Sequence, residues 1–440
     1  MRRRTGTIIS AALALWTIAA AGLQAQESSP PAVGAAADSS SPALSEEDIF
    51  QSGAFDQAVA QSKQEEQQNK LEYLFGGVFL SESTLATTAA FDGYTALGIF
   101  SGKAFVRVSV PSYGSLYLSY NFGHTLFQGE GGAVASTLPG EDLFDATFTL
   151  SEFHVSFDLA KVLFVRIGNQ LIAWGPSVIW TPVDFINRER LDPQAAVDLR
   201  VGKPGIRLHL PLKCSNLFLF TDFSNTVVEN PAGSGNYAVQ DLFRTTNLGL
   251  RGDFTALGFE FGLAGYLGAD IQTRLGFDLS GRILATDIYG EVAFALPSSS
   301  NDFSYASALG FQRTLGELKK WNLQGEFFYN STGEEDSSAY ATPADFTSGG
   351  YVPLYVGRMY AYAGISKQDL IGTFLDGTLS GFMNISDLSY TVSLKGSFEL
   401  SKWIPFSLSL DYSGGGEGKE FTVFSGDHAL SLKARVSFEY

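Results

Sequence analysis

The side chains best suited to act on a passing solute gather between positions 166 and 209. Arg188, Arg190 and Asp192 lie in one stretch, with basic and acidic residues on both sides. The full set is Arg166, Gln170, Arg188, Arg190, Asp192, Asp198, Arg200, Arg207 and His209. Opposed charges across a narrow aqueous gap produce a transverse field that selects solutes by charge and dipole. The alternative is that these charges pair with one another and hold a loop in place.

Histidine is the usual acid–base catalyst, and the chain has four histidines. These are His124, His154, His209 and His428. No Gly-x-Ser-x-Gly elbow or His-x-x-x-His pair accompanies them. His154 has Glu152 and Ser156 two residues away, which imitates a charge-paired nucleophile. Because residues at i and i+2 share a face of any strand, the pattern does not require catalysis, and we expect no enzyme.

Metal ligands are equally scattered. Four separate histidines and the single Cys214 lack the spacing of a zinc site. The acidic run from Glu334 to Asp336 is typical of a solvated loop, with a weak calcium site as the alternative. We therefore expect no metal and no cofactor.

The elements that carry these residues have a period of two. At the end of the chain, apolar residues at even positions from Leu430 to Tyr440 alternate with polar residues from Ser431 to Glu439. A strand places such sets on opposite faces. The strands are long and rich in aromatic residues near their ends, which favours membrane-spanning strands over a soluble sandwich. Only a closed barrel removes sheet edges that lipid cannot satisfy.

The alternation predicts an all-β fold, a closed antiparallel transmembrane β-barrel over residues 71–440. Eighteen strands fit the pattern, and sixteen is the alternative. The predicted strands are 72–81, 95–110, 115–123, 145–158, 162–172, 197–211, 215–223, 242–251, 255–267, 271–281, 284–294, 303–313, 321–330, 352–364, 370–381, 385–398, 404–413 and 428–440.

Short turns alternate with longer connections, as a barrel with both ends in the periplasm requires. The short turns are 111–114, 158–161, 212–215, 251–254, 315–320, 367–370 and 400–403. The long connections include 123–144, 174–196, 224–240, 331–351 and 413–427. The polar parity switches near Pro204, where we expect a β-bulge, and slips again near Ser151 and Glu152.

Composition excludes several classes of protein. The chain has 440 residues, of which 17% are charged, and no later segment offers the ~18 apolar residues of a helical membrane span. The formal charge of −17 becomes −20 when three arginines of the N-terminal segment are subtracted. This acidic balance argues against nucleic acid and against a basic membrane-binding surface.

The first 25 residues have the pattern of a cleaved secretory signal peptide. Arg2 to Arg4 precede the uncharged stretch from Thr7 to Leu23, and the small residue Ala25 follows. An uncleaved anchor is the alternative, but the apolar stretch is short of the ~20 residues that a span needs.

Residues 26–70 form the second part of the chain. They begin with a tract of Ala, Ser and Pro, and Ser45 with its acidic followers could cap a helix that reaches about residue 68. We expect a flexible or helical periplasmic extension, with a partner contact as the alternative.

The alternating strands and the ending Val436-Ser437-Phe438-Glu439-Tyr440 resemble bacterial outer-membrane β-barrels of the porin-like class. In that class the last strand commonly ends in an aromatic residue that the barrel-assembly machinery recognises. The resemblance implies this role for Tyr440, with Phe438 on the same face. Residues 168–175 are also similar to a Gly-x-Gln followed by Trp-Gly in several porin-like families. Outer-membrane lipid and small solutes would be the partners, and a homotrimer and a monomer are both open.

The connection 174–196 resembles the inward-folded constriction loop of porins. It carries Trp180, Pro182, Phe185, Ile186 and Leu191, which are too apolar for a loop in water. We expect it to fold into the lumen or to pack over the barrel mouth.

Together these features predict an outer-membrane, porin-like channel for passive diffusion of small solutes, constricted by that loop. One alternative is a surface interaction protein, an adhesin or scaffold, on a closed barrel. Another is a polysaccharide-binding or export barrel, in which Trp174, Trp180, Phe185 and Tyr237 would stack on sugars.

Overall fold

The computed structural model describes most of the unit that begins at Asn69. The described residues are 71–88, 94–110, 113–131, 146–187, 197–225, 245–268, 271–316, 320–337, 354–372, 374–423 and 427–439. The predicted signal peptide and the extension 26–70 lie outside these residues, as does Tyr440.

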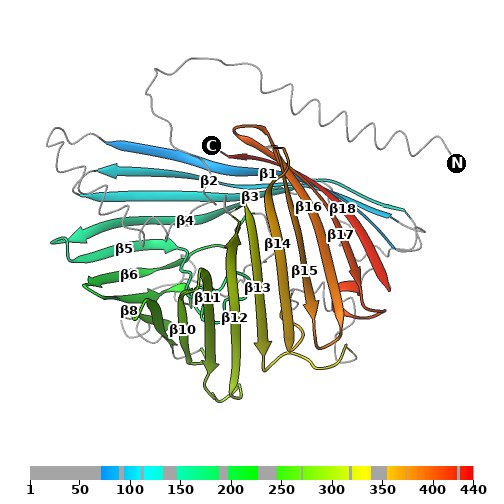
Figure 1. Ribbon diagram of the computed structural model, residues 1–440. Helices are drawn as coiled ribbons and strands as arrows, with labels where there is room; N and C mark the ends of the chain where they lie inside the picture. Colours follow the sequence, from blue (N-terminus) through cyan, green and yellow to red (C-terminus); the bar gives the residue numbers. More distant parts are fainter. Residues whose placement is uncertain are drawn as a thin grey trace, which may run out of the picture. The chain divides into compact units, whose positions relative to one another are not determined.

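In the described part of the chain, eighteen antiparallel strands form one sheet in chain order (Figure 1). The first nine are β1 Glu72–Thr88, β2 Tyr94–Val110, β3 Gly114–Gly131, β4 Ala146–Leu159, β5 Leu163–Gln170, β6 Lys203–Leu212, β7 Ser215–Asp222, β8 Asn247–Ala256 and β9 Phe259–Leu267. The others are β10 Arg274–Ile283, β11 Thr286–Ala295, β12 Ser304–Leu315, β13 Trp321–Asn330, β14 Met359–Ile371, β15 Leu375–Asn384, β16 Ser389–Ser401, β17 Ile404–Gly414 and β18 His428–Glu439.

The last strand closes the sheet on the first. β18 pairs with β1 from Val78 opposite Glu439 to Thr88 opposite Ala429, so the sheet is a closed barrel. The predicted fold and the count of eighteen are confirmed, and the alternative of sixteen is excluded. A short 3₁₀ turn, η2 Glu420–Thr422, lies between β17 and β18. No helix in the described ranges is long and apolar enough to cross a membrane.

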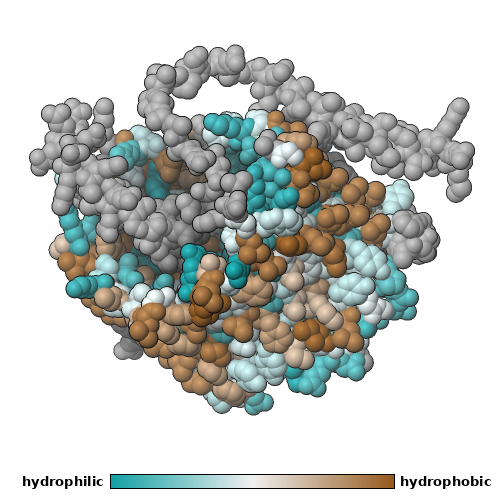
Figure 2. All heavy atoms as spheres, viewed as in Figure 1, coloured by the Kyte–Doolittle hydropathy of each residue, from teal (hydrophilic) through white to brown (hydrophobic). Residues whose placement is uncertain are grey.

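Alternating residues give the barrel two chemically different faces. In β13, Phe327 is exposed on the outer face, whereas its neighbours Glu326 and Phe328 are buried inside. Leucines such as Leu309 and Leu394 are 66% and 58% exposed on the outer face. Figure 2 shows apolar residues in broad patches on the surface turned to the viewer. The sheet therefore exposes apolar side chains outward and gathers polar side chains inward.

Several strand boundaries and one turn differ from the prediction. β1 ends at Thr88 rather than residue 81, and β3 ends at Gly131 rather than residue 123. β6 begins at Lys203 rather than residue 197, β8 at Asn247 rather than 242, and β14 at Met359 rather than 352. The turn after β14 lies at 372–374 instead of 367–370. For β6, the alternating pattern continues into residues 197–202 of the preceding loop, so periodicity alone misplaces its start.

Of the two predicted irregularities, one is present. Ser119 pairs with Glu152 while Tyr120 pairs with Leu150, so Ser151 is the extra residue of a β-bulge. The bulge predicted at Pro204 is wrong, because β5 and β6 pair without a register shift there. The switch of parity near Pro204 instead marks the place where a loop becomes a strand.

Tight turns join several hairpins on the side of the short connections. Ala160 and Lys161 have φ of 56° and 57°, and Leu284 and Ala285 have φ of 49° and 64°. Two consecutive residues with positive φ match the right-handed twist of the flanking strands. These turns hold neighbouring strands in register at little cost in chain length.

Gly205 tests how tightly the inner wall is packed. A Cβ on Gly205 would lie 2.6 Å from Phe220 Cζ, and closer still to the carbonyl oxygen of Thr221. We expect Gly205→Ala to lower the free energy of unfolding by about 1–3 kcal/mol, because the backbone must shift. Gly396→Ala is the matched control, since its Cβ would meet Leu375 Cδ1 at 3.5 Å. Urea unfolding of the refolded barrel measures both, and equal midpoints would contradict this account.

Candidate functional site

The connection between β5 and β6 crosses the interior of the barrel. Its described parts are 171–187 and 197–202. Backbone groups of its first part bond to carboxylates on β11 and β13, six and eight strands further along the sheet. Of the two predicted placements, the lumen and the barrel mouth, the described residues of this loop take the first. We call residues 171–202 the crossing loop.

Glu291 of β11 binds the crossing loop at two points, Ser177 and Val183. Its carboxylate accepts hydrogen bonds from the backbone N–H of Ser177 at 2.8 Å and of Val183 at 3.0 Å. Gly175, with φ of 96°, lies against the same carboxylate, where any Cβ would collide with it. The absence of a side chain at position 175 therefore lets the loop approach the wall closely.

Glu326 of β13 binds residues 178–180, which are the tip of the crossing loop. Its carboxylate accepts backbone hydrogen bonds from Val178, Ile179 and Trp180, the last at 2.7 Å. The Tyr289 hydroxyl donates to the same group at 2.9 Å. Hydrogen bonds from peptide groups to a buried charged acceptor are roughly twice as strong as neutral ones. A single carboxylate thus accepts hydrogen bonds from three successive N–H groups, of which those of Ile179 and Trp180 are buried.

Trp180 inserts into an aromatic pocket of the wall. Its side chain is fully buried and stacks on Phe328 with ring centroids 5.4 Å apart, while Tyr360 and Phe382 pack around it. Its indole N–H donates to the Leu354 carbonyl at 3.0 Å. The indole is therefore an anchor with both its apolar and its polar needs met.

A second apolar cluster holds the base of the crossing loop. Ile172, Trp174, Val183, Phe185 and Ile186 are buried against inner-wall residues of β7, β9 and β11. These wall residues are Phe220, Ala264, Tyr266 and Ala293. Two of these four wall residues are alanines, which leave space for the large side chains of the loop.

The connection between β17 and β18 also enters the interior. Glu420 accepts hydrogen bonds from Leu354 N, Tyr360 Oη and Asn384 Nδ2, and its own N–H donates to Asp387. Burial raises the pKa of the Glu420 carboxyl despite these donors. Since Leu354 also receives the indole N–H of Trp180, this connection and the crossing loop are joined through one residue.

Part of the predicted charge set pairs with itself. Arg200 Nη1 lies 3.0 Å from Asp184 Oδ2, and Arg200 Nη2 lies 2.9 Å from Asp198 Oδ2. Burial opposes ionisation of Asp198, but hydrogen bonds and charge from Arg200 outweigh it and hold the pKa of Asp198 below its ordinary 3.8. For these residues the alternative of internal pairing describes the structure, because both arms of the crossing loop are joined by Arg200.

The bulge on β4 receives the returning arm. The Ser151 hydroxyl donates to the Arg200 carbonyl at 3.0 Å, and Gly202 N donates to the Ser151 carbonyl at 2.9 Å. Glu152 is buried beside it and accepts from Leu171 N at 3.0 Å and from Lys103 Nζ at 3.1 Å. Glu152 is thus committed to the loop, not to the neighbouring His154.

Arginines of β2, β5 and β6 lie on the inner face of the barrel wall. Arg166 on β5 is directly opposite Arg207 on β6, and both side chains are half-buried on the inner face. Arg107 on β2 lies over the Tyr117 ring at 5.4 Å, and Tyr117 stacks on His154 at 5.1 Å. The inner face of β2 to β6 therefore presents a row of cationic and aromatic groups.

The remaining predicted residues have different surroundings. His209 stacks on Phe218 at 4.3 Å and shares a 3.0 Å hydrogen bond with Asn216. Gln170 is fully buried, and its amide nitrogen lies 3.4 Å from the Gly205 carbonyl oxygen. Arg188, Arg190 and Asp192 lie outside the described residues. Phe438 lies on β18 opposite Phe79, and its assembly role stays a prediction.

Sequence reasoning missed the two main anchors. Glu326 is the only charged residue of β13, whereas Glu291 shares β11 with Asp287 near the start of that strand, and both glutamates lie on the inner parity. A lone carboxylate in the middle of an apolar strand was a usable signal, because burial of such a group demands donors. Within the described ranges, no group of three or more His, Cys, Asp or Glu residues could hold a metal ion.

Several solved structures have a similar fold. The structure of Pseudomonas aeruginosa OpdK with vanillate matches with a TM-score of 0.53 at 9% identity, covering 84% of this chain and 98% of that chain. OccK2 (OpdF) from the same organism matches at 0.50 and 11% identity, covering 83% and 97%. Acinetobacter baumannii OccAB1 matches at 0.50 and 10% identity, covering 84% and 96%. No protein-family model and no curated protein sequence matches the chain. The likeness shows a shared fold.

Removal of the Glu326 carboxylate is expected to loosen the tip of the crossing loop. Glu326→Ala leaves three peptide N–H groups without their acceptor, each costing about 1–3 kcal/mol if it stays buried. We expect hydrogen exchange at residues 178–180 to become at least roughly tenfold faster. Glu260→Ala, at an exposed carboxylate of β9, is the control. Unchanged protection in Glu326→Ala would show that the carboxylate does not hold the loop.

The pairing of Asp198 with Arg200 predicts a pH dependence. Because the pKa of Asp198 is lowered in the folded state, its contribution to stability is complete above pH 3.8 and is lost as the pH falls through the folded pKa. The difference in unfolding free energy between the wild type and Asp198→Asn should be constant from about pH 7 to about pH 5. It should shrink below the ordinary pKa of 3.8.

Denaturant unfolding across this pH range measures the difference. Asp302→Asn is the control, because Asp302 is exposed in the connection between β11 and β12. A wild-type to Asp198→Asn difference that persists undiminished at pH 3 would contradict the role given to this pair.

Proposed function

We propose that the chain is an outer-membrane channel for passive diffusion of small solutes, narrowed by the crossing loop. The observation that carries this proposal is the tie between the loop and the far wall, through Glu291 and Glu326. A barrel of eighteen strands encloses more space than its own side chains fill. A loop held across that space reduces the opening without closing it.

The outer face supports a place in the membrane. Leucines such as Leu263, Leu309 and Leu394 are more than half exposed on it. In water, a continuous apolar surface of this kind would be an aggregation hazard, whereas in a bilayer it is the required solvent match. Closure of β18 on β1 leaves no strand edge unpaired, which a bilayer also requires.

The inner wall supports a preference for anionic solutes. Arg107, Arg166 and Arg207 share the inner face of β2, β5 and β6, whereas Lys103 of β2 is paired with Glu152. Glu291 and Glu326, on the facing wall, are buried beneath the crossing loop and bonded to its backbone. A cationic wall opposite screened carboxylates attracts anions. The fold neighbour OpdK has been solved with vanillate, which is in keeping with such a solute.

The sugar-stacking alternative loses its support. Trp174, Trp180 and Phe185 are buried in the two apolar clusters, so their faces are covered by protein. Tyr237 lies outside the described residues. The aromatic residues of the crossing loop are therefore anchors. Single-channel conductance distinguishes the proposed channel from the adhesin or scaffold alternative.

Single-channel recording of the refolded chain in planar bilayers tests the channel. We expect discrete steps, and a variant lacking residues 177–181 should give steps roughly twofold larger, because the tip of the crossing loop no longer narrows the lumen. Arg166→Gln with Arg207→Gln should shift the reversal potential away from anion preference. Lys402→Gln, at an exposed lysine in the turn between β16 and β17, is the charge control. A folded barrel without steps in either form would overturn the proposal.

A further inference from the structure

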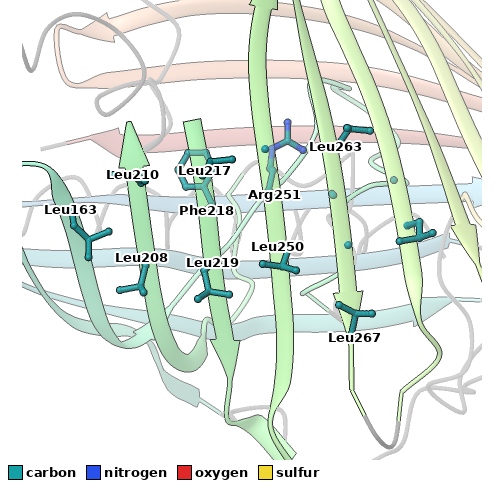
Figure 3. Close-up of a pocket in the computed structure, with 15 residues that line it drawn as sticks. Leu163, Leu208, Leu210, Leu217, Phe218, Leu219, Leu250, Arg251, Leu263 and Leu267 are labelled. Carbon is teal, nitrogen blue, oxygen red and sulfur yellow. The ribbon is translucent and has the colours of Figure 1, made fainter. Parts of the chain in front are cut away.

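The outer wall carries an apolar hollow that the channel function does not explain. It lies over β5 to β10 and measures about 660 Å³ (Figure 3). Side chains that stand on the outer face enclose it. They include Leu208, Leu217, Leu219, Leu250, Leu263 and Leu275. Arg251 is the one charged residue of the lining, and its guanidinium pairs with Asp278 on the inner face. The outward side chains are apolar, so the surface suits hydrocarbon rather than a polar ligand.

Two glycines make the hollow. Gly252 lies between Leu217 and Leu263 in the sheet register, and Gly265 lies between Leu250 and Leu275. An added Cβ would meet Leu217 Cδ2 at 3.4 Å or Leu275 Cδ2 at 3.7 Å, which are ordinary contacts. The sheet would therefore accept larger residues at both positions.

The inner-facing glycines nearby differ in this respect. A Cβ on Gly276 would come within 2.8 Å of Phe185 Cζ, so the crossing loop requires glycine there. Packing gives no comparable reason for Gly252 or Gly265. What these two positions provide is space on the outer face.

Two lysines lie at the short-turn end of the same wall. Lys161 is in the turn between β4 and β5, and Lys213 is in the turn between β6 and β7. Both are exposed, and they lie two and three residues from Leu163 and Leu210 of the hollow. At about 3.3 Å per residue, the hollow begins within about 10 Å of each lysine along the strands. In a membrane barrel this is the periplasmic side, where a lysine reaches the headgroup layer.

We propose that this hollow binds an acyl chain of an anionic phospholipid of the periplasmic leaflet, whose phosphate lies at Lys161 and Lys213. The proposal rests on the proposed function in one respect, that the barrel lies in a bilayer. Each methylene that leaves disordered lipid for a fitted leucine surface gains contacts, and the lysines add attraction for the anionic headgroup.

A lipid fits the hollow better than a second copy of the chain. The outer wall of a barrel is convex, so a second barrel would touch the leucine rim and leave the glycine floor empty. A stable protein interface also needs about 800 Å² on each partner, well matched along its length. A flexible acyl chain follows the hollow without these constraints.

Native mass spectrometry of the refolded chain tests lipid binding. The chain is released from micelles that contain phosphatidylglycerol or phosphatidylcholine, and the retained lipid is counted. Gly252→Leu with Gly265→Leu fills the hollow and should lower retention about tenfold. Gly290→Leu on the outer face of β11 is the matched control, since its Cβ would also meet a leucine, Leu309, at 3.4 Å. It should retain lipid as the wild type does.

A milder variant and a headgroup variant complete the design. Gly252→Ala with Gly265→Ala should give intermediate retention if the barrel with leucines does not refold. Lys161→Gln with Lys213→Gln should abolish the preference for phosphatidylglycerol while phosphatidylcholine retention stays unchanged. Lys402→Gln is the control for loss of an exposed turn lysine.

Two results would overturn the proposal. One is equal lipid retention by the wild type and the filled variants. The other is a dimer that disappears when the hollow is filled, which would make a second copy the occupant. Single-channel steps are recorded for the same preparations. Steps without hollow-dependent lipid reject this site and leave the channel intact, whereas absence of steps with lipid retained rejects the channel alone.

Discussion

The structure depends on the satisfaction of peptide N–H groups inside the barrel. A loop that leaves the wall carries backbone donors into a space where protein replaces water, and each unsatisfied donor costs free energy. Glu291 and Glu326 resolve this by accepting five backbone N–H groups between Ser177 and Val183. The burial of Trp180 and the close approach of Gly175 depend on these carboxylates, because the carboxylates hold the loop backbone in place.

This constraint also shapes the electrostatics of the lumen. The acids of β11 and β13 lie beneath the crossing loop, while Arg166 and Arg207 lie together on the inner face of β5 and β6. A solute in the lumen therefore meets the arginines of one wall more directly than the carboxylates of the other. The same loop that narrows the lumen covers the carboxylates, so steric and electrostatic selection arise from one arrangement.

Much of the architecture could be predicted, and the failures have physical reasons. Alternation located all eighteen strands and the bulge at Ser151, because the side-chain period of a strand is two and an extra residue breaks it. The same rule misplaced the start of β6, since 197–202 keeps an alternating pattern in an extended loop. The candidate charges near 198–200 were found, but their pairing within the loop was left between two alternatives.

By itself, the sequence determined the closed barrel and favoured eighteen strands over sixteen, because both follow from periodicity. It left the apolar loop 174–196 between the lumen and the barrel mouth. The tertiary structure decided which residues meet. Glu326 and Trp180 are far apart in the chain, and only closure of the sheet brings the wall of β13 to the tip of a loop from β5. Gln170 is fully buried, and the residues that cover it are likewise set by the tertiary structure. Periodicity assigns a side chain to a face, but the partner it finds there depends on contacts between distant strands.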